Sequence, residues 1–413
     1  MLLDMTNFSE LGLSPEILAA VQKLGYTKPS PVQAKAIPLV LQRKNVVACA
    51  QTGTGKTAAF TLPLMQLIQR SKGKELAPRA LIVSPVRELA QQIDKVARTV
   101  SHQTNLRVGV VVGGEKYKPQ LARLKNGVDV LVATPGRLLD LIQNKHISLR
   151  NVEILVLDEA DRMLDMGFWP QIKNVMKTIP KDAQKLLFSA TIGNEIQKMV
   201  DSYMPDPEIV EIARKGMTAD RIDQCAMPVT MLQKSDLLLA VLDRMAVGKT
   251  LVFTRTKRRA DRVVRILRKN GIKCEPIHGD RSQNQRNRAL SMFAKGKIDV
   301  LVTTDVISRG IDIKDLDHVI NFDVPDSPED YVHRIGRTGR AGASGNAITF
   351  VAPEEISNFR AIEFLTKKVV PCVDVENFVY RDDRIVPNPE RSATKKAQSR
   401  GGFRGGRGRY RRR

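Results

Sequence analysis

The chain has 413 residues, of which 42% are hydrophobic and 27% charged, and its 67 basic and 44 acidic side chains give a formal charge of +23. The composition is typical of a soluble globular protein, and the length is enough for two or three domains that each bury a core. Ten basic residues and no acidic residue lie in 391–413, so residues 1–390 still carry 23 − 10 = +13. This basic excess favours a polyanion, above all nucleic acid, as partner; a basic surface that only serves solubility is the alternative.

Cysteine usage and hydropathy exclude several other classes of protein. The four cysteines show no close pairing, which excludes a C-x-x-C metal or redox motif and indicates reduced thiols in a cytosolic protein. The first ten residues, "MLLDMTNFSE", lack the basic and apolar segments of a secretory signal. No apolar run approaches the ~20 residues that a membrane span needs. We therefore expect a cytoplasmic protein with no membrane partner.

Short β-branched runs alternate with amphipathic stretches along the chain, the pattern of parallel sheets covered by helices on both faces. In chain order, the predicted strands of the first half are residues 45–50, 80–85, 128–134, 153–160 and 185–191. Those of the second half are residues 250–256, 298–305, 318–324 and 346–352. We therefore predict an α/β fold with two tandem domains, each a parallel sheet flanked by helices.

A polar, proline-broken stretch after residue 205 separates the two predicted domains. We place an N-terminal domain at 1–210, a linker at 211–222, a C-terminal domain at 223–372 and an extension at 373–413. The extension ends in an arginine- and glycine-rich tail that begins at residue 391 and has almost no aliphatic residues. Such a segment cannot pack a core, so the tail is predicted to be disordered and to bind RNA through its charge.

The sequence "AQTGTGKT" (50–57) follows a predicted strand and precedes a helical pattern, which is the arrangement of a P-loop. Its glycines let backbone N–H groups wrap phosphates at the helix N-terminus, Lys56 supplies charge to the β and γ phosphates, and the Thr57 hydroxyl reaches Mg²⁺. Ala50 stands where the motif usually has glycine, and a glycine-rich turn without a role is the alternative. The predicted ATP-binding residues here are Gln51, Thr52, Gly53, Thr54, Gly55, Lys56 and Thr57.

Two acids end a hydrophobic strand in "LVLDEADRML" (156–165). Asp158 is placed to hold Mg²⁺, partly through water, and Glu159 to orient and deprotonate the attacking water. The alternative is a helix N-terminus that carries acids because they favour that end of the helix dipole. The P-loop earlier in the chain favours the catalytic interpretation.

Together with the P-loop, the sequences "DEAD" (158–161), "SAT" (189–191) and "HRIGRTGR" (333–340) resemble the DEAD-box ATP-dependent RNA helicases over about residues 8 to 370. The tail, the short N-terminus and "HGDRSQNQRNRAL" (278–290) most resemble the bacterial RhlE-type branch. The resemblance implies two RecA-like domains, with ATP in the cleft between them and RNA bound across both. It also implies RNA-stimulated ATP hydrolysis coupled to closure of the domains and to local, non-processive unwinding of short duplexes.

The resemblance assigns further residues to the nucleotide. In "GYTKPSPVQ" (25–33), Gln33 resembles the glutamine that reads adenine, and Phe8 the aromatic that stacks on the base. Ser30, Pro31 and Gln33 also fit a helix capping box, and Gln33 cannot fully serve both roles. From the second domain, the predicted contacts are Gly310, Asp312, Arg337 and Arg340, with Arg340 as the arginine finger. For Arg334 a salt link and an RNA contact fit equally well.

Coupling and RNA binding are likewise implied by the family. The coupling residues are Ser189, Thr191, Asp161 and His333. The RNA contacts are Arg87, Gly114, Thr134, Arg137, Gln283, Arg286 and Thr304, and Val86 stands where the family usually has threonine. These contacts reach the phosphate and sugar backbone, and with only 5% aromatic residues there is little material for base stacking. We therefore expect RNA binding that is largely independent of sequence.

Three alternatives remain open at this stage. A processive DNA-translocating helicase would share the P-loop and the arginine finger. A non-enzymatic RNA clamp or annealing protein would use the tail, as would a pure tail-driven binding module. We expect a monomer that uses ATP and Mg²⁺ and acts in ribosomal-precursor or RNA-decay assemblies.

Overall fold

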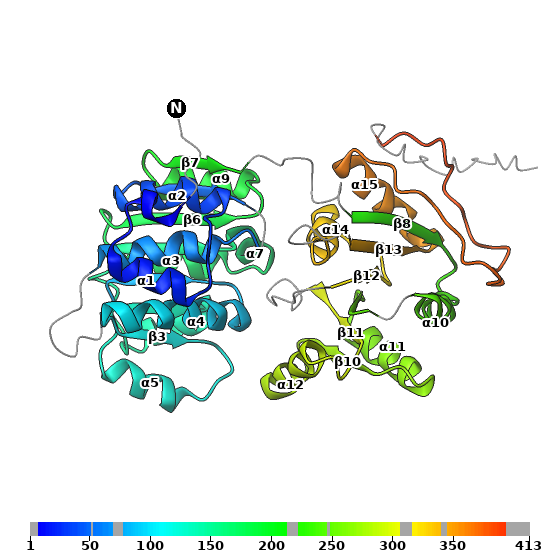
Figure 1. Ribbon diagram of the computed structural model, residues 1–413, viewed down its shortest axis with the longest axis horizontal. Coiled ribbons are helices and arrows are strands. Elements are labelled where there is room, and N and C mark those ends of the chain that lie inside the picture. Colours follow the sequence, from blue (N-terminus) through cyan, green and yellow to red (C-terminus); the bar gives the residue numbers. More distant parts are fainter. Residues whose placement is uncertain are drawn as a thin grey trace, which may run out of the picture. The chain divides into compact units, whose positions relative to one another are not determined.

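The computed structural model describes residues 7–50, 53–68, 77–212, 222–245, 248–305, 316–339 and 345–393. The chain divides into two compact units, Met1–Arg214 and Lys215–Arg413. Each unit is an α/β layer structure with its own parallel sheet (Figure 1). Among the described residues, no helix combines the length and the apolar character that a membrane span requires.

The first unit is built on a seven-stranded parallel sheet of order β3-β4-β2-β5-β6-β1-β7. Its strands are rich in valine, leucine and isoleucine, and nearly all residues of the central strands are buried because helices cover both faces. The strands are β1 (Val46–Cys49), β2 (Ala80–Val83), β3 (Val108–Val111), β4 (Val130–Ala133), β5 (Ile154–Asp158), β6 (Gln184–Ser189) and β7 (Glu208–Glu211).

Helices α1 to α4 pack on one face of this sheet and α5 to α9 on the other, so two separate hydrophobic cores form (Figure 1). The helices are the short 3₁₀ helix η1 (Phe8–Leu11), α1 (Pro15–Lys23), α2 (Pro31–Leu41), α3 (Lys56–Leu67), α4 (Arg87–Thr104), α5 (Tyr117–Lys125), α6 (Pro135–Gln143), α7 (Ala160–Asp165), α8 (Trp169–Thr178) and α9 (Asn194–Tyr203). Because these strands are parallel, the P-loop after β1, Asp158 at the end of β5 and Ser189 at the end of β6 lie at the same edge of the sheet.

The second unit has a six-stranded parallel sheet of order β10-β11-β9-β12-β13-β8. The strands are β8 (Ile222–Pro228), β9 (Thr250–Phe253), β10 (Cys274–Ile277), β11 (Val300–Thr303), β12 (His318–Asn321) and β13 (Gly345–Val351). The helices are α10 (Lys234–Arg244), α11 (Lys257–Lys269), α12 (Gln283–Ala294), α14 (Pro328–Ile335), η3 (Pro353–Glu355) and α15 (Ile356–Thr366). Helices α10 and α11 pack on one face, and α12, α14 and α15 on the other.

All nine predicted strands are present, and the fold class is confirmed. The strand that was predicted to reach residue 160 ends at Asp158, because the backbone turns into α7 at Glu159. The sequence interpretation missed β3, β7, β8 and β10. All four are edge strands, with a neighbouring strand on one side only, and β3, β7 and β10 have just four residues each, so their periodic signal in the sequence is short.

Residues after α15 remain packed against the second unit as far as Ala393. Cys372 pairs with Ala226 beside β8, and the chain then runs as coil toward α10, where Gln233 hydrogen-bonds the backbone of Val379 and Arg381 (Figure 1). Arg391, the first residue of the predicted tail, is bound to the buried carboxylate of Glu363 at 2.8 Å. The remaining tail residues, 394–413, lie outside the described part of the chain.

Candidate functional site

The P-loop joins β1 to α3 at the carboxyl edge of the first sheet. Gly53 and Gly55 have φ angles of 86° and 91°, in the left-handed region that favours glycine. A Cβ on Gly55 would lie 2.4 Å from the side-chain nitrogen of Gln33, so this position also needs the missing side chain. Lys56 is the first residue of α3, as the motif requires, and Gln51 and Thr52 lie outside the described residues.

Lys56 and Glu159 form a buried ion pair at this edge. Their Nζ and Oε1 atoms are 3.0 Å apart, and each residue is 5% exposed. Burial alone would lower the pKa of Lys56, but the carboxylates of Glu159, Asp158 and Asp161 outweigh it, so the lysine pKa is raised. Glu159 itself is held at a φ of 54°, a strained turn between β5 and α7 that points its side chain at the P-loop lysine.

Asp158 lies beside this pair but is poorly compensated. Burial raises its pKa to about 7, with a further contribution from Glu159, although the charge on Lys56 opposes the shift. Its Oδ1 atom is buried and has no hydrogen-bond partner in the described part of the protein. An orphaned carboxylate oxygen beside the P-loop, with the Thr57 hydroxyl at the start of α3, is a hard-oxygen donor set that fits Mg²⁺.

Gln33 uses both ends of its amide within the protein. Its Oε1 accepts from the backbone N–H of Ser30 at 2.8 Å, and its Nε2 donates to the carbonyl of Gly55 at 3.0 Å. The Gln33 half of the capping box at the start of α2 is therefore formed, whereas the Ser30 hydroxyl has no hydrogen-bond partner among the described residues. The same Gln33 side chain ties α2 to the P-loop. Phe8 is 5% exposed and stacks on Tyr26 with ring centroids 6.4 Å apart. The predicted adenine contacts of Gln33 and Phe8 remain predictions.

Three of the predicted coupling residues lie in one hydrogen-bond network. The Asp161 Oδ2 atom accepts the N–H groups of Ala190 and Thr191 at 3.0 Å each, and the Thr191 hydroxyl at 3.2 Å. Ser189 donates from its hydroxyl to the Thr191 carbonyl at 2.7 Å. The loop after β6 is thus fixed to the start of α7, directly after the acidic pair. His333, the fourth predicted residue, lies on α14 of the second unit.

The predicted RNA contacts of the first unit gather near the ends of β3 and β4. The Arg87 guanidinium covers Gly114 so closely that a Cβ there would lie 1.7 Å from its Nη2. Thr134 accepts the N–H of Gly113 on its hydroxyl at 3.2 Å, and Arg137 lies over the ring of Tyr117 at 5.0 Å. Val86 occupies the N-cap position of α4, where a threonine hydroxyl would accept an N–H of the first turn and valine cannot.

In the second unit, Gln283 and Arg286 lie in the first turn of α12, and the Arg286 Nη2 donates to the Gln283 side chain at 2.6 Å. Thr304 directly follows β11 and is 9% exposed. Arg337 follows α14 and is 3% exposed. The other three predicted nucleotide contacts, Gly310, Asp312 and Arg340, lie outside the described residues.

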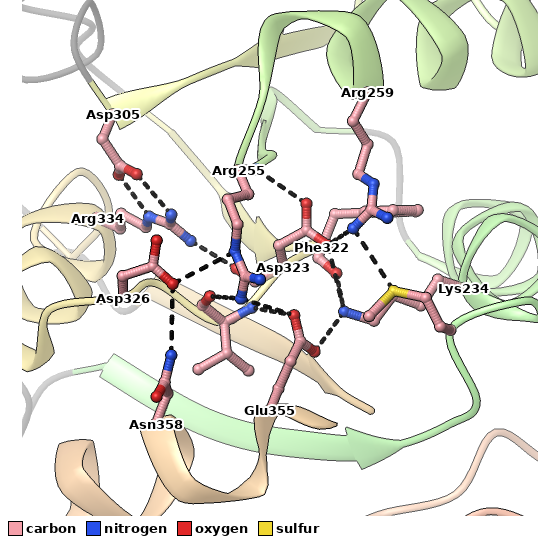
Figure 2. Close-up of polar contacts among 12 residues, drawn as sticks. Lys234, Arg255, Arg259, Asp305, Phe322, Asp323, Asp326, Arg334, Glu355 and Asn358 are labelled. Atoms are coloured by element: carbon pink, nitrogen blue, oxygen red, sulfur yellow. Dashed lines mark hydrogen bonds and ion pairs between the residues drawn. The ribbon is translucent and has the colours of Figure 1, made fainter. Parts of the chain in front are cut away.

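Arg334 is a structural ion-pair residue, which resolves the choice that its sequence left open. It is 2% exposed, and its Nε and Nη2 atoms donate to the two carboxylate oxygens of Asp305 at 2.6 and 2.7 Å (Figure 2). Its third nitrogen, Nη1, donates to the Asp323 carbonyl at 2.7 Å and to Asn321 at 3.2 Å. Four of its five N–H groups thus have acceptors among the described residues, and the group is buried over Phe253, which favours the salt link over a contact to RNA phosphate.

A second buried lysine, Lys234, shares Asp323 with this arginine and was not found by sequence reasoning. It is fully buried, and its Nζ donates to the Phe322 carbonyl at 2.7 Å, to Glu355 at 2.6 Å and to Asp323 at 3.4 Å (Figure 2). Asp323 also accepts the backbone N–H of Arg255 and is paired with Arg259. No local sequence pattern marks these residues, because Lys234 is 89 positions from Asp323 and 121 from Glu355.

Comparison with known proteins matches both units to known protein families. The family model described as DEAD/DEAH box helicase matches residues 30–199, and that of the helicase conserved C-terminal domain matches residues 233–342. The ATP-dependent RNA helicase CshA of Listeria monocytogenes is 46% identical over 364 residues, which are 88% of this chain and 69% of that protein. CshA of Geobacillus kaustophilus is 44% identical over 88% of this chain and 77% of its own length.

Solved structures give the same result for the fold. Dbp5 of S. cerevisiae bound to RNA and ADP BeF3 superposes with a TM-score of 0.80 at 34% identity, over 90% of this chain and 96% of that one. Mss116p bound to ssRNA and AMP-PNP superposes with a TM-score of 0.79 at 28% identity, over 89% of this chain and 78% of that one. The predicted RhlE-type branch is not supported, because the related bacterial sequences are named CshA.

Proposed function

This chain belongs to the DEAD-box family of RNA helicases, and we propose from this membership and from its buried charges how it uses ATP. The protein is an ATP-dependent RNA helicase, in which RNA-stimulated hydrolysis is coupled to closure of the two units and to local unwinding of short duplexes. The observation that carries the proposal is the Lys56–Glu159 pair with Asp158 beside it at the P-loop.

The ion pair suggests the order of events at the nucleotide. Lys56 is held by Glu159 at 3.0 Å, so a phosphate that binds at the P-loop competes for the lysine and releases the carboxylate. Glu159 is then free to orient and deprotonate water. Thr57 and Asp158 would hold Mg²⁺, which neutralises phosphate charge when it is bound. Burial raises the pKa of Asp158 to about 7, so a proton and Mg²⁺ would compete for this carboxylate near neutral pH.

The division of labour between the units follows the family pattern. Residues 1–210 would hold ATP and the residues 223–372 would supply Arg337, Arg340, Gly310 and Asp312 to it. ATP and RNA each favour the closed arrangement in this scheme, so they bind cooperatively. An arginine finger is worth roughly 10³ to 10⁵ in rate. Its separation from the phosphates when the units part would suppress turnover without RNA.

Binding of RNA through its backbone is supported by the predicted contacts. Arg87, Gly114, Thr134 and Arg137 of the first unit present guanidinium, backbone and hydroxyl groups, and few aromatic rings accompany them. Such a set recognises phosphate and sugar without reading bases. The tail would add electrostatic tethering. The four free cysteines support a reducing, cytoplasmic location, and a monomer acting in ribosomal-precursor or RNA-decay assemblies fits this scheme.

Nucleotide turnover measured with matched RNA and DNA oligomers, followed by unwinding of a short RNA duplex, tests the proposal. We expect strong stimulation by RNA and little by DNA, and loss of the stimulated hydrolysis in Arg340→Ala with nucleotide binding retained. Equal stimulation by DNA would favour a DNA-translocating helicase. If Arg340→Ala lowered only RNA affinity, the arginine would be an RNA contact and not the finger.

A further inference from the structure

Helix α11 of the second unit carries an unusual concentration of positive charge. Its 13 residues, KRRADRVVRILRK, include seven basic side chains and one acidic one, Asp261. One face packs into the core through Ala260, Val263, Val264 and Leu267. The opposite face presents Arg258, Arg262, Arg265 and Lys269, all exposed. We call these four residues the α11 stripe.

The spacing places the stripe on a single line along the helix. Its members follow one another at intervals of four, three and four residues, which puts them on one face of an α-helix. At 1.5 Å of rise per residue the stripe is about 16 Å long. The acidic residue Asp261 lies on the flank and is bound to His278 and Arg281, so it does not neutralise the stripe. In the described part of the protein, no ion pair involves any stripe residue.

Local stability does not explain this arrangement. Like charges three or four residues apart destabilise a helix, and the stripe contains three such neighbouring pairs. The helix dipole favours cations only near the C-terminus, which accounts for Lys269 but not for the first turn. That turn contains Lys257, Arg258 and Arg259 and has no acidic residue. Lys257 and Arg259 are paired with Asp280 and Asp323, whereas Arg258 is not paired within the described residues.

The position of α11 connects the stripe to the predicted RNA-binding edge. Three residues separate the helix from the end of β9, whose last residue, Phe253, pairs with Thr303 of β11, and the predicted RNA contact Thr304 follows. Because β9 and β10 are parallel, α11 runs from the carboxyl edge of the sheet back along its face. The stripe therefore starts at the edge that holds Thr304, one of the predicted RNA contacts, and leads away from it along the outside of the unit.

We propose that the α11 stripe binds the phosphate backbone of the RNA segment that continues beyond the contacts at the carboxyl edge. This inference rests on the proposed RNA helicase function and adds a second, ATP-independent binding surface to it. Three of the four residues are arginines, which suit phosphate oxygens, and the only apolar side chain near them on α11 is the half-buried Ile266 on the flank, with no aromatic residue on the helix. An acidic protein partner is disfavoured for that reason, since stable protein interfaces contain an apolar core.

Charge neutralisation of the stripe tests the proposal in the full chain. The stripe variant is Arg258→Gln, Arg262→Gln, Arg265→Gln, Lys269→Gln. The control variant, Lys125→Gln, Lys177→Gln, Lys181→Gln, Lys295→Gln, removes the same charge from exposed lysines elsewhere. Binding is measured from low to high salt with two single-stranded RNAs, one of about ten nucleotides, within the site size of a single groove, and one about four times longer.

We expect the stripe variant to bind the long RNA at least about tenfold more weakly at low salt, with a salt slope smaller by about 0.7 for each phosphate that the variant no longer neutralises. Affinity for the short RNA, and the turnover of ATP when that RNA is saturating, should match the control variant.

Equal salt slopes of the two variants for the long RNA would overturn the proposal and leave a protein partner as the occupant. A loss of saturated turnover would overturn it too, since the stripe would then belong to the ATPase core. Failure of the helicase function itself would appear in the unsubstituted protein as an absence of RNA-stimulated turnover.

Discussion

Each unit buries one lysine among carboxylates, but the two lysines are treated differently. Lys56 of the first unit has one carboxylate partner at 3.0 Å, and the neighbouring Asp158 is left with an unpartnered buried oxygen and a pKa of about 7. Lys234 of the second unit donates to two carboxylates and a carbonyl, and its partners accept further N–H groups. We call the site of Lys56 the unfinished site, because it contains a buried carboxylate oxygen without a hydrogen-bond partner among the described residues. We call the site of Lys234 the satisfied site, because the lysine and its carboxylates are all hydrogen-bonded.

The difference distinguishes a site that awaits a ligand from one that holds the fold together. A buried polar group without a partner costs folding free energy, so it persists where a ligand later satisfies it. A fully bonded network instead fixes the relative positions of the elements that contribute to it. Lys234, Asp323 and Glu355 join α10, the segment after β12 and η3, and Arg334 extends the network to α14 (Figure 2).

The largest effect is expected at the unfinished site. Glu159→Gln removes the proposed base but keeps a side chain of the same size, so RNA-stimulated ATP turnover should fall by about 10²- to 10⁴-fold. Nucleotide binding, followed with a fluorescent analogue, should persist. Glu195→Gln, at an exposed carboxylate paired with Lys198, is the matched control. Turnover within a few fold of the unsubstituted protein would show that another group activates the water, and retained biological activity would favour an RNA clamp.

At the satisfied site the expected effect is on stability. Lys234→Met removes the fully buried cation that contacts both Asp323 and Glu355 and leaves these carboxylates to the partly exposed Arg259 and Arg255, which should lower the free energy of unfolding of the second unit by up to about 3 to 5 kcal/mol. The single tryptophan, Trp169, lies on α8 of the first unit, so its fluorescence reports that unit alone. Circular dichroism follows both units.

In a urea titration, unfolding of the second unit is detected by circular dichroism but not by Trp169 fluorescence. In Lys234→Met this transition should move to a lower urea concentration. Lys198→Met, at an exposed ion pair, should move neither transition. A shift below about 1 kcal/mol for Lys234→Met would mean that the carboxylates take up protons or water and that the network is not a main determinant of stability. The contrast between the two lysines would then rest on catalysis only.

The sequence predicted the unfinished site better than the satisfied one, for a physical reason. Phosphate binding demands glycines and a lysine at fixed local spacing, so the P-loop is visible in eight consecutive residues. The network around Lys234 joins residues about 90 to 120 positions apart, each of which looks like an ordinary surface charge in its own segment. Arg334 is intermediate between a local motif and a long-range network. Its motif is recognisable in the sequence, but its role as an ion-pair residue follows only from its partners Asp305 and Asp323 in the structure.

Asp158→Asn tests the comparison of the two lysine sites through the pH dependence of the free energy of unfolding. In the native state Asp158 holds its proton up to about pH 7, whereas in the unfolded chain it loses it near pH 4. The native state therefore binds more protons between these values, and the unsubstituted protein loses stability as pH rises, by at most about 1.4 kcal/mol per pH unit. Asparagine does not titrate, so the variant should gain stability relative to the unsubstituted protein as the pH is raised from 5 to 8.

Trp169 fluorescence in urea, in chelator without Mg²⁺ or nucleotide, measures this difference. Asp182→Asn, at an exposed carboxylate of the same unit, should follow the unsubstituted protein across the whole pH range. A constant difference between Asp158→Asn and the unsubstituted protein would show that Asp158 is ionised throughout. The first site would then be less unfinished than its geometry indicates.

The smallest expected effect on stability is at Gln33, whose side-chain amide is hydrogen-bonded at both ends and contacts the P-loop at Gly55. Gln33→Ala removes the bonds to the Ser30 N–H and the Gly55 carbonyl, so the first unit should lose about 1 to 2 kcal/mol of unfolding free energy even without nucleotide. The adenine hypothesis makes the separate prediction that this variant no longer prefers ATP to GTP. Gln197→Ala, which removes an exposed helical bond to Asp201, is the control for stability.

Lost stability with the ATP preference intact would assign Gln33 to capping alone. The reverse result would mean that the capping bonds contribute little and that the amide is available to adenine. Loss of both would show that one side chain fixes the P-loop in the empty site and reads the base in the filled one, which requires its amide to exchange partners when ATP binds.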